Sequence, residues 1–324
     1  MKSLRVGLAY NLMRGGGEDE AEFDTPETLD SIVRAIEAHG HKVVLWEATP
    51  DFVRMADPKT VDIVFNIAEG FSGSNREAHV PAVLEFLGIP FTGADPAGMS
   101  ICMDKGLAKR LMSGANVRTP EYEIMDRPGI STRLEFPLVV KPVAEGSSKG
   151  ISDDSVVSDT AALWRVVGFV NQRYRQQALI ERFLPGREFT VGILGNGESA
   201  AVLPIMEIIF LDSFTPHRMY SFAVKQDWKR YVRYDAPARI DPALKTEIEE
   251  MCLKAYEACK CRDAARLDVR LDGNGRPHLL DVNALPGICP GYSDLVFVAE
   301  AAGLSHAGLV GAILENAATR YGIL

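Results

Sequence analysis

Acidic and amide side chains alternate along a predicted β-hairpin in the last quarter of the 324-residue chain. The segment reads ARLDVRLDGNGRPHLLDVNALPG, and DGNG is typical of a tight turn between antiparallel strands. Successive side chains of a strand point to opposite faces. If position 268 lies opposite position 281, Asp268, Asp281 and Asn283 share one face, with Cβ atoms about 5 Å apart across the strands. Arg266 and Arg270 then lie on the same face.

Carboxylate and amide oxygens without histidine or cysteine suit Mg²⁺ held together with phosphates, rather than zinc. The alternative is an ordinary solvated face of a hairpin. Two features favour a ligand site. Asp and Asn are poor strand formers, and the second strand continues into Leu-Pro-Gly, whose backbone N–H groups could serve a ligand.

A glycine- and serine-rich loop follows a buried-looking strand in LVVKPVAEGSSKG, residues 138–150. The strand ends in Lys141, and the loop can turn backbone N–H groups and hydroxyl groups toward phosphate oxygens. The GxxxxGK[ST] pattern of P-loops is absent. A glycine-rich hairpin turn with a solvated Lys149 is therefore the alternative, and this segment alone leaves both open.

Two acids, Glu181 and Glu188, flank the turn in LIERFLPGREFTVGILG, residues 179–195. One interpretation is a strand whose backbone and carboxylate meet a nucleoside. The other is a hairpin with exposed acids, and the segment by itself does not decide between them.

An alternation of strands and helices must position these segments, and it changes near residue 95. Strands are predicted at 4–10, 42–46 and 61–66, and helices at 26–38 and 77–87. Strands separated by helices are typical of a small doubly wound parallel α/β layer.

The rest of the chain is predicted to form two α+β units. It includes an irregular stretch at 210–238 and a helical tail at 294–320. We expect an α/β protein of three domains: an N-terminal domain at 1–95, a central subdomain at 96–185, and a C-terminal subdomain with the metal site at 186–324.

Charge and composition narrow the function classes. Lys and Arg total 35 against 44 Asp and Glu, and a formal net charge of −9 argues against a nucleic-acid-binding surface. Hydrophobic residues make up 47%, which is typical of a folded chain rather than a disordered one. No apolar run reaches the roughly 18 residues needed to cross a membrane, and a cytoplasmic protein without a membrane partner is expected. Five irregularly spaced cysteines do not predict a disulfide framework.

The order and spacing of four segments resemble the pattern of ATP-grasp proteins, and more narrowly that of the D-alanine–D-alanine ligase family. These segments are MDKGLAKRLM, VVKPVAEGSSKG, LIERFLPGREFTV and RLDVRLDGNGRPHLLDVNALPG. The resemblance extends from VGLAY through FNIAEG and GIPFTG to the end of the chain. It implies an N-terminal parallel sheet followed by two α+β domains that clamp ATP. It also implies a cytoplasmic ligase of cell wall biogenesis, for which a homodimer is a family expectation.

The resemblance implies a nucleotide site and a metal site. The implied phosphate-binding residues are Lys105, Lys141, Gly146, Ser147 and Ser148. The strand that faces adenine would be Glu181, Arg182, Phe183 and Leu184, and the group that accepts the ribose hydroxyls would be Glu188. The implied ligands of two Mg²⁺ ions, for which Mn²⁺ could substitute, are Asp268, Asp281 and Asn283.

The resemblance also implies residues that act on the reacting atoms. Lys225, in SFAVKQDW, matches the mobile-loop lysine that reaches the γ-phosphate, and Ser147 would close over the phosphates. Arg266 and the backbone N–H of Gly287 would stabilise the oxyanion of a tetrahedral intermediate.

Such an enzyme activates an amino-acid carboxylate as an acyl phosphate and condenses it with an amine to form a dipeptide or amide. A closing segment around 210–235 would exclude water, which hydrolyses acyl phosphates. Two alternatives stay open. One is a nucleotide-binding protein without ligation that serves as a sensor or partner subunit, and the other is an ATP-grasp kinase with a stable phosphorylated product.

The segments that in this family would bind the amino-acid substrates depart from the family pattern. Glu69-Gly70 stands where His-Gly is usual, and a carboxylate there could pair with an ammonium group. In NLMRGGGEDEAEFDTP, either Glu20 or Glu22 could replace the glutamate that grips the first substrate. Past Pro-Gly, ICPGYS delays Ser293 by about one residue. We therefore expect amino-acid-like substrates whose identity and stereochemistry stay open.

Overall fold

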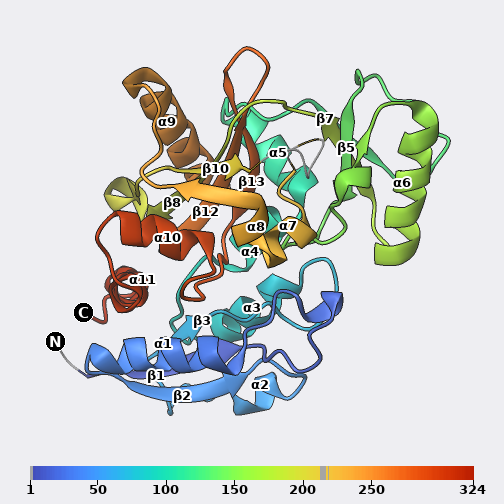
Figure 1. Cartoon of the computed structure of the whole chain (residues 1–324). Coiled ribbons are helices and arrows are strands. Elements are labelled where there is room, and N and C mark those ends of the chain that lie inside the picture. Colours follow the sequence, from blue (N-terminus) through green and yellow to red (C-terminus); the bar gives the residue numbers. More distant parts are fainter. Residues whose placement is uncertain (1–2, 212–216, 218) are drawn as a thin grey trace.

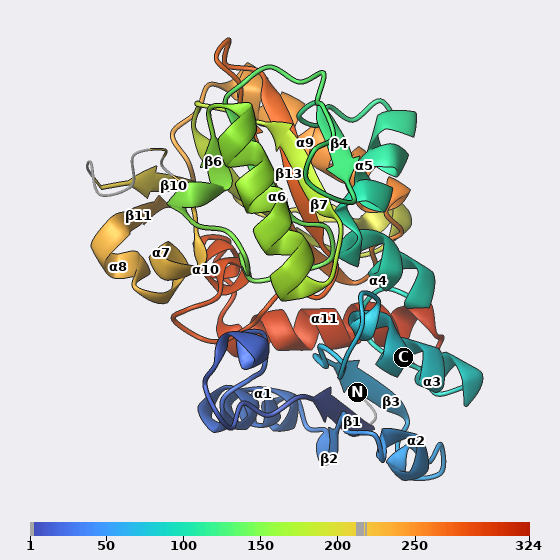
Figure 2. The same cartoon turned by 90° about the vertical axis from the view of Figure 1, so that its right-hand side faces the viewer.

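The structure is a computed structural model that describes residues 3–211, 217 and 219–324. Within these residues, three β-sheets follow one another along the chain, each with covering helices (Figure 1). The N-terminal sheet lies at one end of the molecule and the two later sheets lie at the other, with the last helix between them (Figure 2).

The first sheet is parallel, in the order β2-β1-β3. Its elements are β1 (Arg5–Tyr10), α1 (Pro26–Ala38), β2 (Lys42–Glu47), α2 (Phe52–Met55), β3 (Ile63–Asn66) and α3 (His79–Phe86). Successive side chains of β1 enter different cores: Val6 and Leu8 pack with α1, and Ala9 packs with α2 and α3. Both faces of the sheet are thus covered, and the predicted doubly wound layer is confirmed.

Helix α1 begins where the sequence predicts. Thr25 caps it, since its Oγ1 accepts a hydrogen bond from the N–H of Thr28 at 3.3 Å, and Pro26 occupies the first helical position. Ile32 and Ile36, one turn apart, are fully buried against the sheet.

The second sheet is antiparallel, in the order β4-β7-β5-β6, and α6 covers one face of it. The elements of this part are α4 (Pro96–Met103), α5 (Lys105–Gly114), β4 (Tyr122–Met125), β5 (Leu138–Pro142), β6 (Val156–Val157), α6 (Thr160–Tyr174) and β7 (Ala178–Arg182). Strand β5 is buried along its whole length, which agrees with its continuous apolar sequence.

The third sheet is also antiparallel, in the order β11-β10-β8-β12-β13, with β9 beside β8. Its elements are β8 (Glu188–Leu194), β9 (Ala201–Val202), β10 (Met206–Phe210), β11 (Val232–Asp235), α9 (Pro242–Ala258), β12 (Ala264–Leu271) and β13 (Pro277–Asn283). Leu267 and Val269 of β12 pack in one core with Ile248 and Cys252 of α9. Because side chains alternate, the polar side chains of β12 face away from α9.

The stretch 210–238 is not irregular, contrary to the prediction. It contains α7 (Phe222–Gln226), α8 (Trp228–Tyr231) and β11, while 212–216 and 218 lie outside the described residues. Both helices span little more than one turn, which is too short for a helical period to show in the sequence.

The predicted helical tail is two helices, α10 (Asp294–Ala301) and α11 (His306–Arg320). The break follows from Gly303, whose φ is +81°, and from Ser305, which caps α11 by accepting a hydrogen bond from the N–H of Gly308 at 3.1 Å. Among the described residues, no single helix is long and apolar enough to cross a membrane. Helices α10 and α11 pass a test of length and composition only as a pair, bent by 98°.

Asp263 joins three parts of the chain at a point where solvent does not reach its side chain. Its carboxylate accepts hydrogen bonds from Arg320 Nη2 at 2.7 Å, from Asn196 Nδ2 at 2.8 Å and from the backbone N–H of Gly93 at 2.8 Å. This carboxylate therefore links the end of the N-terminal region, the segment after β8 and α11.

We expect Asp263→Ala to lower the free energy of unfolding by about 3 kcal/mol, because the largely buried Arg320 then loses its counter-ion. Urea unfolding followed by circular dichroism measures the change. Arg54→Ala, which removes only an exposed ion pair with Asp51, is the control and should leave the unfolding midpoint in place. Equal midpoints for the wild type and Asp263→Ala would contradict this account of Asp263.

Candidate functional site

The hairpin of β12 and β13 has the predicted register. Asp268 lies opposite Asp281, Arg266 lies opposite Asn283, and a bulge follows Asp268. The Asp268 carboxylate accepts hydrogen bonds from Arg266 Nε at 3.2 Å and Nη2 at 3.0 Å, and from Thr190 Oγ1 at 3.1 Å. These contacts fix the orientation of the carboxylate.

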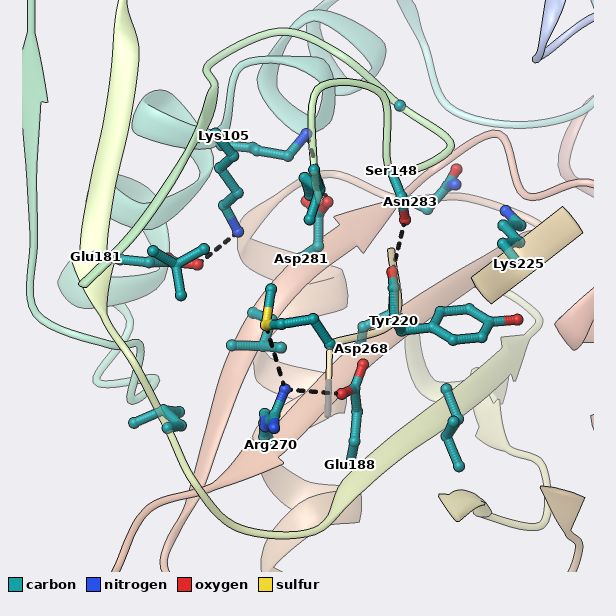
Figure 3. A pocket seen from close by; sticks show the side chains of 18 of the residues that line it. Lys105, Ser148, Glu181, Glu188, Tyr220, Lys225, Asp268, Arg270, Asp281 and Asn283 are labelled. Atoms are coloured by element: carbon teal, nitrogen blue, oxygen red, sulfur yellow. Dashed lines mark hydrogen bonds and ion pairs between the residues drawn. The ribbon is translucent and has the colours of Figure 1, made fainter. Parts of the chain in front are cut away.

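Asp268, Asp281 and Asn283 line one cavity (Figure 3). An oxygen of Asp281 lies 3.5 Å from Lys105 Nζ, and Asn283 Oδ1 accepts a hydrogen bond from the N–H of Leu285 at 3.0 Å. The donor set is oxygen only, and carboxylate and amide oxygens keep lone pairs for a cation. These residues fit Mg²⁺, whereas zinc favours nitrogen and sulfur ligands.

A buried carboxylate holds two lysines at the wall of this cavity. Glu181 on β7 lies 2.6 Å from Lys141 Nζ and 2.9 Å from Lys109 Nζ. Burial opposes ionisation of Glu181, but the two ammonium groups outweigh it and lower its pKa to about 2. Burial likewise opposes the charge of Lys141, but Glu181 outweighs it and raises the pKa of that lysine. Lys141 is therefore held charged beside the cavity.

Lys109 is not among the predicted residues, and the Glu181 carboxylate contacts lysines rather than lying free at a nucleoside site. The signal for Lys109 is its spacing of four residues from Lys105 in MDKGLAKRLM, which places both side chains on one face of α5. Lys105, the first residue of α5, donates a hydrogen bond to the carbonyl oxygen of Glu145 at 2.6 Å.

The loop after β5 turns over the cavity. Ser147 and Ser148 have φ of +49° and +57°, a left-handed backbone that is unfavourable for residues with a side chain. Ser148 Oγ donates a hydrogen bond to the carbonyl oxygen of Tyr220 at 3.0 Å, which ties the loop to the segment before α7. A Cβ atom at Gly146 would lie 2.3 Å from Glu22 Oε1, so a side chain there would displace the Glu22 carboxylate.

The other end of the cavity is lined by Arg182, Phe183 and Leu184, as predicted. The guanidinium of Arg270 lies 5.1 Å from the ring centroid of Phe183 and donates a hydrogen bond to Glu188 Oε2 at 3.1 Å. Burial raises the pKa of Glu188 to about 7, although Arg270 opposes this. Arg270, to which no function was assigned from the sequence, therefore orients the Glu188 carboxylate.

A second cavity of about 440 Å³ adjoins the first. The residues that line both cavities are Gly146, Ser147, Lys225, Arg266 and Asn283. The predicted residues that line the second cavity alone are Glu22, Glu69, Gly287 and Ser293. Apart from Glu20, the structure thus brings every predicted site residue to one of two adjoining cavities.

Positive charge gathers where the two cavities meet. Burial opposes the charge of Arg266, but Asp268 and Asp294 outweigh it and raise the pKa of the guanidinium. Lys225 extends from α7, and burial together with the nearby Arg266 lowers its pKa. An anion at this junction would contact both cations, and its charge would offset the repulsion between them.

Two further contacts shape the second cavity. Ser293 Oγ accepts a hydrogen bond from the N–H of Cys289 at 2.9 Å and would lie 3.0 Å from a Cβ atom at Gly287. Tyr220 was not predicted, and its hydroxyl lies 2.5 Å from that of Tyr234.

Glu20 and Glu22 have different surroundings. Glu20 Oε2 accepts hydrogen bonds from the backbone N–H groups of residues 14–16 at 2.6 to 3.3 Å, and the residue does not line the second cavity. Glu22 lines it, and its oxygens accept hydrogen bonds from Arg76 Nη2 at 2.8 and 3.0 Å and from Lys149 Nζ at 2.8 Å. Of the two alternatives, Glu22 is the one that lines the second cavity, and its role toward a substrate stays a prediction. Lys149 is buried, so the interpretation of a solvated lysine is wrong.

Comparisons with known proteins agree with this geometry. Residues 115–315 match the family model described as D-ala D-ala ligase C-terminus. The chain is 37% identical over 301 residues to the protein y4sG of Sinorhizobium fredii, covering 90% of this chain and 88% of that protein. It is 33% identical to a D-alanine–D-alanine ligase of Bordetella petrii, covering 80% and 77% of the two chains, and 30% identical to one of Thermotoga maritima, covering 96% and 98%.

Solved structures show the same fold. The D-alanine–D-alanine ligase of Bacillus anthracis complexed with ATP superposes with a TM-score of 0.77 at 24% identity, covering 97% of each chain. The VanG D-Ala:D-Ser ligase of Enterococcus faecalis superposes with a TM-score of 0.75 at 19% identity, covering 98% and 100%. The predicted ATP-grasp fold is confirmed.

Glu181→Gln removes the charge that Lys109 and Lys141 share. We expect the free energy of unfolding near pH 7 to fall by about 3 kcal/mol. Because the folded pKa of Glu181 is lowered to about 2 from an ordinary value of 4.5, its stabilisation is present above about pH 4.5 and is lost as the pH falls toward 2.

The difference between wild type and Glu181→Gln should therefore shrink as the pH is lowered through this range. Urea unfolding at several pH values measures it, with the exposed Glu121→Gln as the matched control. A difference that stays constant with pH would show that Glu181 is not held ionised by the two lysines.

Proposed function

The chain belongs to the D-alanine–D-alanine ligase family of ATP-dependent carbon–nitrogen ligases, and on that premise we propose that it uses ATP to join the carboxylate of one amino acid to the amine of another. The observation that carries the proposal is the meeting of the two cavities at Arg266 and Lys225. A phosphate-sized group in the first cavity and a carboxylate in the second would meet between these cations.

In this proposal the first cavity binds ATP. Lys105 and Lys141 bind phosphate oxygens, and the loop 146–148 closes over them with its backbone N–H groups and the Ser147 hydroxyl. The strand 181–184 lies along the adenine ring, and Glu188 accepts hydrogen bonds from the ribose hydroxyls. The buried Glu181 supports this assignment, because it keeps Lys141 in place and charged before the nucleotide binds.

Asp268, Asp281 and Asn283 would hold two Mg²⁺ ions, for which Mn²⁺ could substitute. When bound, the metal ions neutralise charge between the phosphate oxygens and the approaching carboxylate. The proposed assignment is supported by the all-oxygen donor set on one face of the hairpin.

The reaction has two steps. A carboxylate oxygen of the donor attacks the γ-phosphorus, the bond from that phosphorus to the β,γ-bridging oxygen breaks, and ADP leaves. The acceptor amine then attacks the carbonyl carbon, inorganic phosphate leaves, and the amine loses a proton. Lys225 stabilises the transferred phosphoryl group, and Arg266 with the N–H of Gly287 stabilises the oxyanion.

In this proposal, residues 219–231, which include α7 and α8, help to keep water from the acyl phosphate. The hydrogen bond from Ser148 Oγ to the carbonyl oxygen of Tyr220 supports it, since it joins this segment to the phosphate-binding loop. A second link is the contact between the hydroxyls of Tyr220, just before α7, and Tyr234 in β11.

Amino acids are the proposed substrates, because the Bordetella and Thermotoga relatives are D-alanine–D-alanine ligases. Ser293 is the proposed donor to the acceptor carboxylate, since its oxygen already accepts from Cys289 and its proton is free to point into the cavity. The domain limits near 95 and 185, a homodimeric assembly and a cytoplasmic location stay predictions.

We expect ADP release that requires both a donor and an acceptor amino acid, measured by a coupled assay with mass spectrometry of the product. Arg266→Ala should lower kcat about 100-fold, because an oxyanion donor is lost, while ADP affinity changes little. Arg54→Ala, far from both cavities on an exposed helix, is the control.

The proposal fails if no pair of D- or L-amino acids raises ADP release above background. A stable phosphorylated product without an amide would favour the kinase alternative instead. Nucleotide binding that persists without any turnover would favour a binding protein.

A further inference from the structure

The wall that the N-terminal region contributes to the second cavity is acidic. Four carboxylate side chains of this region line the cavity, and we call them the acidic wall: Glu22, Asp24, Glu69 and Glu77. Carboxyl oxygens of Glu22, Glu69 and Glu77 all lie within 4.8 Å of one another. So many carboxylates at such short range repel one another unless cations accompany them.

The backbone around Gly70 brings two of these acids together. Gly70 has φ of +81°, and a Cβ atom there would lie 2.0 Å from the carbonyl oxygen of Arg76. Its N–H donates a hydrogen bond to Asn11 Oδ1 at 3.0 Å, which anchors the turn to the end of β1. The chain can therefore fold back so that Glu69 and Glu77, eight positions apart, face the same cavity.

The cations beside the acidic wall are already engaged. Arg76 Nη2 donates to both oxygens of Glu22 and lies 3.2 Å from Glu145. Lys149 Nζ lies 2.8 Å from Glu22 and 3.6 Å from Glu145. These two cations form ion pairs with Glu22 and Glu145. Arg76 acts on Glu69 and Glu77 only at longer range, as does Lys105 on Glu77.

Asp24, Glu69 and Glu77 have no hydrogen bond or ion pair from their carboxyl groups within the described part of the chain. Glu77 is only 8% exposed, yet it lines the second cavity, so a ligand in the cavity could contact its buried carboxyl group. Burial raises the pKa of Asp24 and of Glu77 to about 7. Burial, together with Glu77 and Glu22, raises the pKa of Glu69 well above its ordinary value.

Resting on the proposed function, we propose that the donor substrate is a diamino acid, and that the acidic wall binds its two ammonium groups. The donor carboxylate must lie near Arg266, where the cavities meet, so the opposite end of the donor faces the wall. One α-ammonium group would pair with only one of the three unpaired carboxyl groups, and a cation beside a carboxyl group favours its ionised form. A second ammonium group, on the donor's side chain, would bind between Glu69 and Glu77 and pair with another of these carboxyl groups.

A divalent metal ion is the competing occupant of three neighbouring carboxylates. Glu22 argues against it, because its oxygens already accept hydrogen bonds from Arg76 and Lys149. Only Glu69 and Glu77 of that trio then have free carboxyl groups, whereas a hard cation takes about six or more oxygen ligands. The position of the wall inside the substrate cavity also favours an organic cation.

Hydroxylamine trapping tests the choice of donor apart from the acceptor. With ATP, Mg²⁺ and hydroxylamine, an activated donor forms a hydroxamate that is measured by colour and mass. The diamino donors are diaminobutyrate, ornithine and lysine. Each is compared with the amino acid that has an uncharged side chain of the same carbon length, which is aminobutyrate, norvaline and norleucine, respectively. Both the D and the L forms are used. We expect at least one diamino donor to exceed its uncharged counterpart by about tenfold or more in kcat/KM, the scale of one desolvated charge pair.

The isosteric variants Glu69→Gln and Glu77→Gln locate the effect. Each should lower, by about 30-fold, the ratio of kcat/KM for the diamino donor to kcat/KM for its counterpart with an uncharged side chain. The exposed Glu37→Gln is the matched control. Unchanged ADP affinity in each variant shows that the chain is folded and the first cavity intact.

Several results would overturn the inference. One is an equal kcat/KM for diamino donors and for donors with uncharged side chains. Another is an equal loss of kcat/KM for both classes of donor in Glu69→Gln and Glu77→Gln. A third is Mn²⁺ binding to the nucleotide-free enzyme that disappears in Glu77→Gln. Hydroxamate from uncharged donors alone overturns this inference and leaves the proposed function standing. No hydroxamate from any donor overturns both.

Discussion

Cations proposed to bind phosphate in a largely enclosed cavity must be present there before the phosphate binds, and in this protein neighbouring carboxylates pair with them. Glu181 holds Lys141, Asp281 lies beside Lys105, and Asp268 holds Arg266. An unpaired buried charge is costly, so each cation needs such a partner in the empty state. The arrangement depends on the hairpin register and on the adjacent sheets, which bring acids and bases from separate segments to one cavity.

The second cavity departs from this balance. Around the first cavity each of these cations has an acid beside it, whereas at the acidic wall Asp24, Glu69 and Glu77 form no ion pair within the described part of the chain. A positively charged substrate would supply what is missing. The same rule of paired charges thus accounts for a proposed ATP site whose cations have acids of the chain beside them, and for a proposed substrate site that a charged ligand would complete.

Much of the site could be predicted because it depends on local patterns. Alternation and a DGNG turn were enough to place Asp268 opposite Asp281. Glu77 could not be found this way, because its position depends on a turn at Gly70 that packs against the backbone of Arg76. The short helices α7 and α8 were missed because little more than one turn shows no period, and Glu20 could not be told from Glu22 until their hydrogen-bond partners were known.

The central claim is that the two cavities meet so that ATP activates a carboxylate as an acyl phosphate. Ligation with a donor in which both carboxylate oxygens are ¹⁸O tests this claim most directly. The carboxylate oxygen that attacks the γ-phosphorus stays bonded to it and leaves in the inorganic phosphate. Mass spectrometry of the inorganic phosphate should find one ¹⁸O atom per amide formed. Phosphate without ¹⁸O, released while the amide forms, would contradict the account.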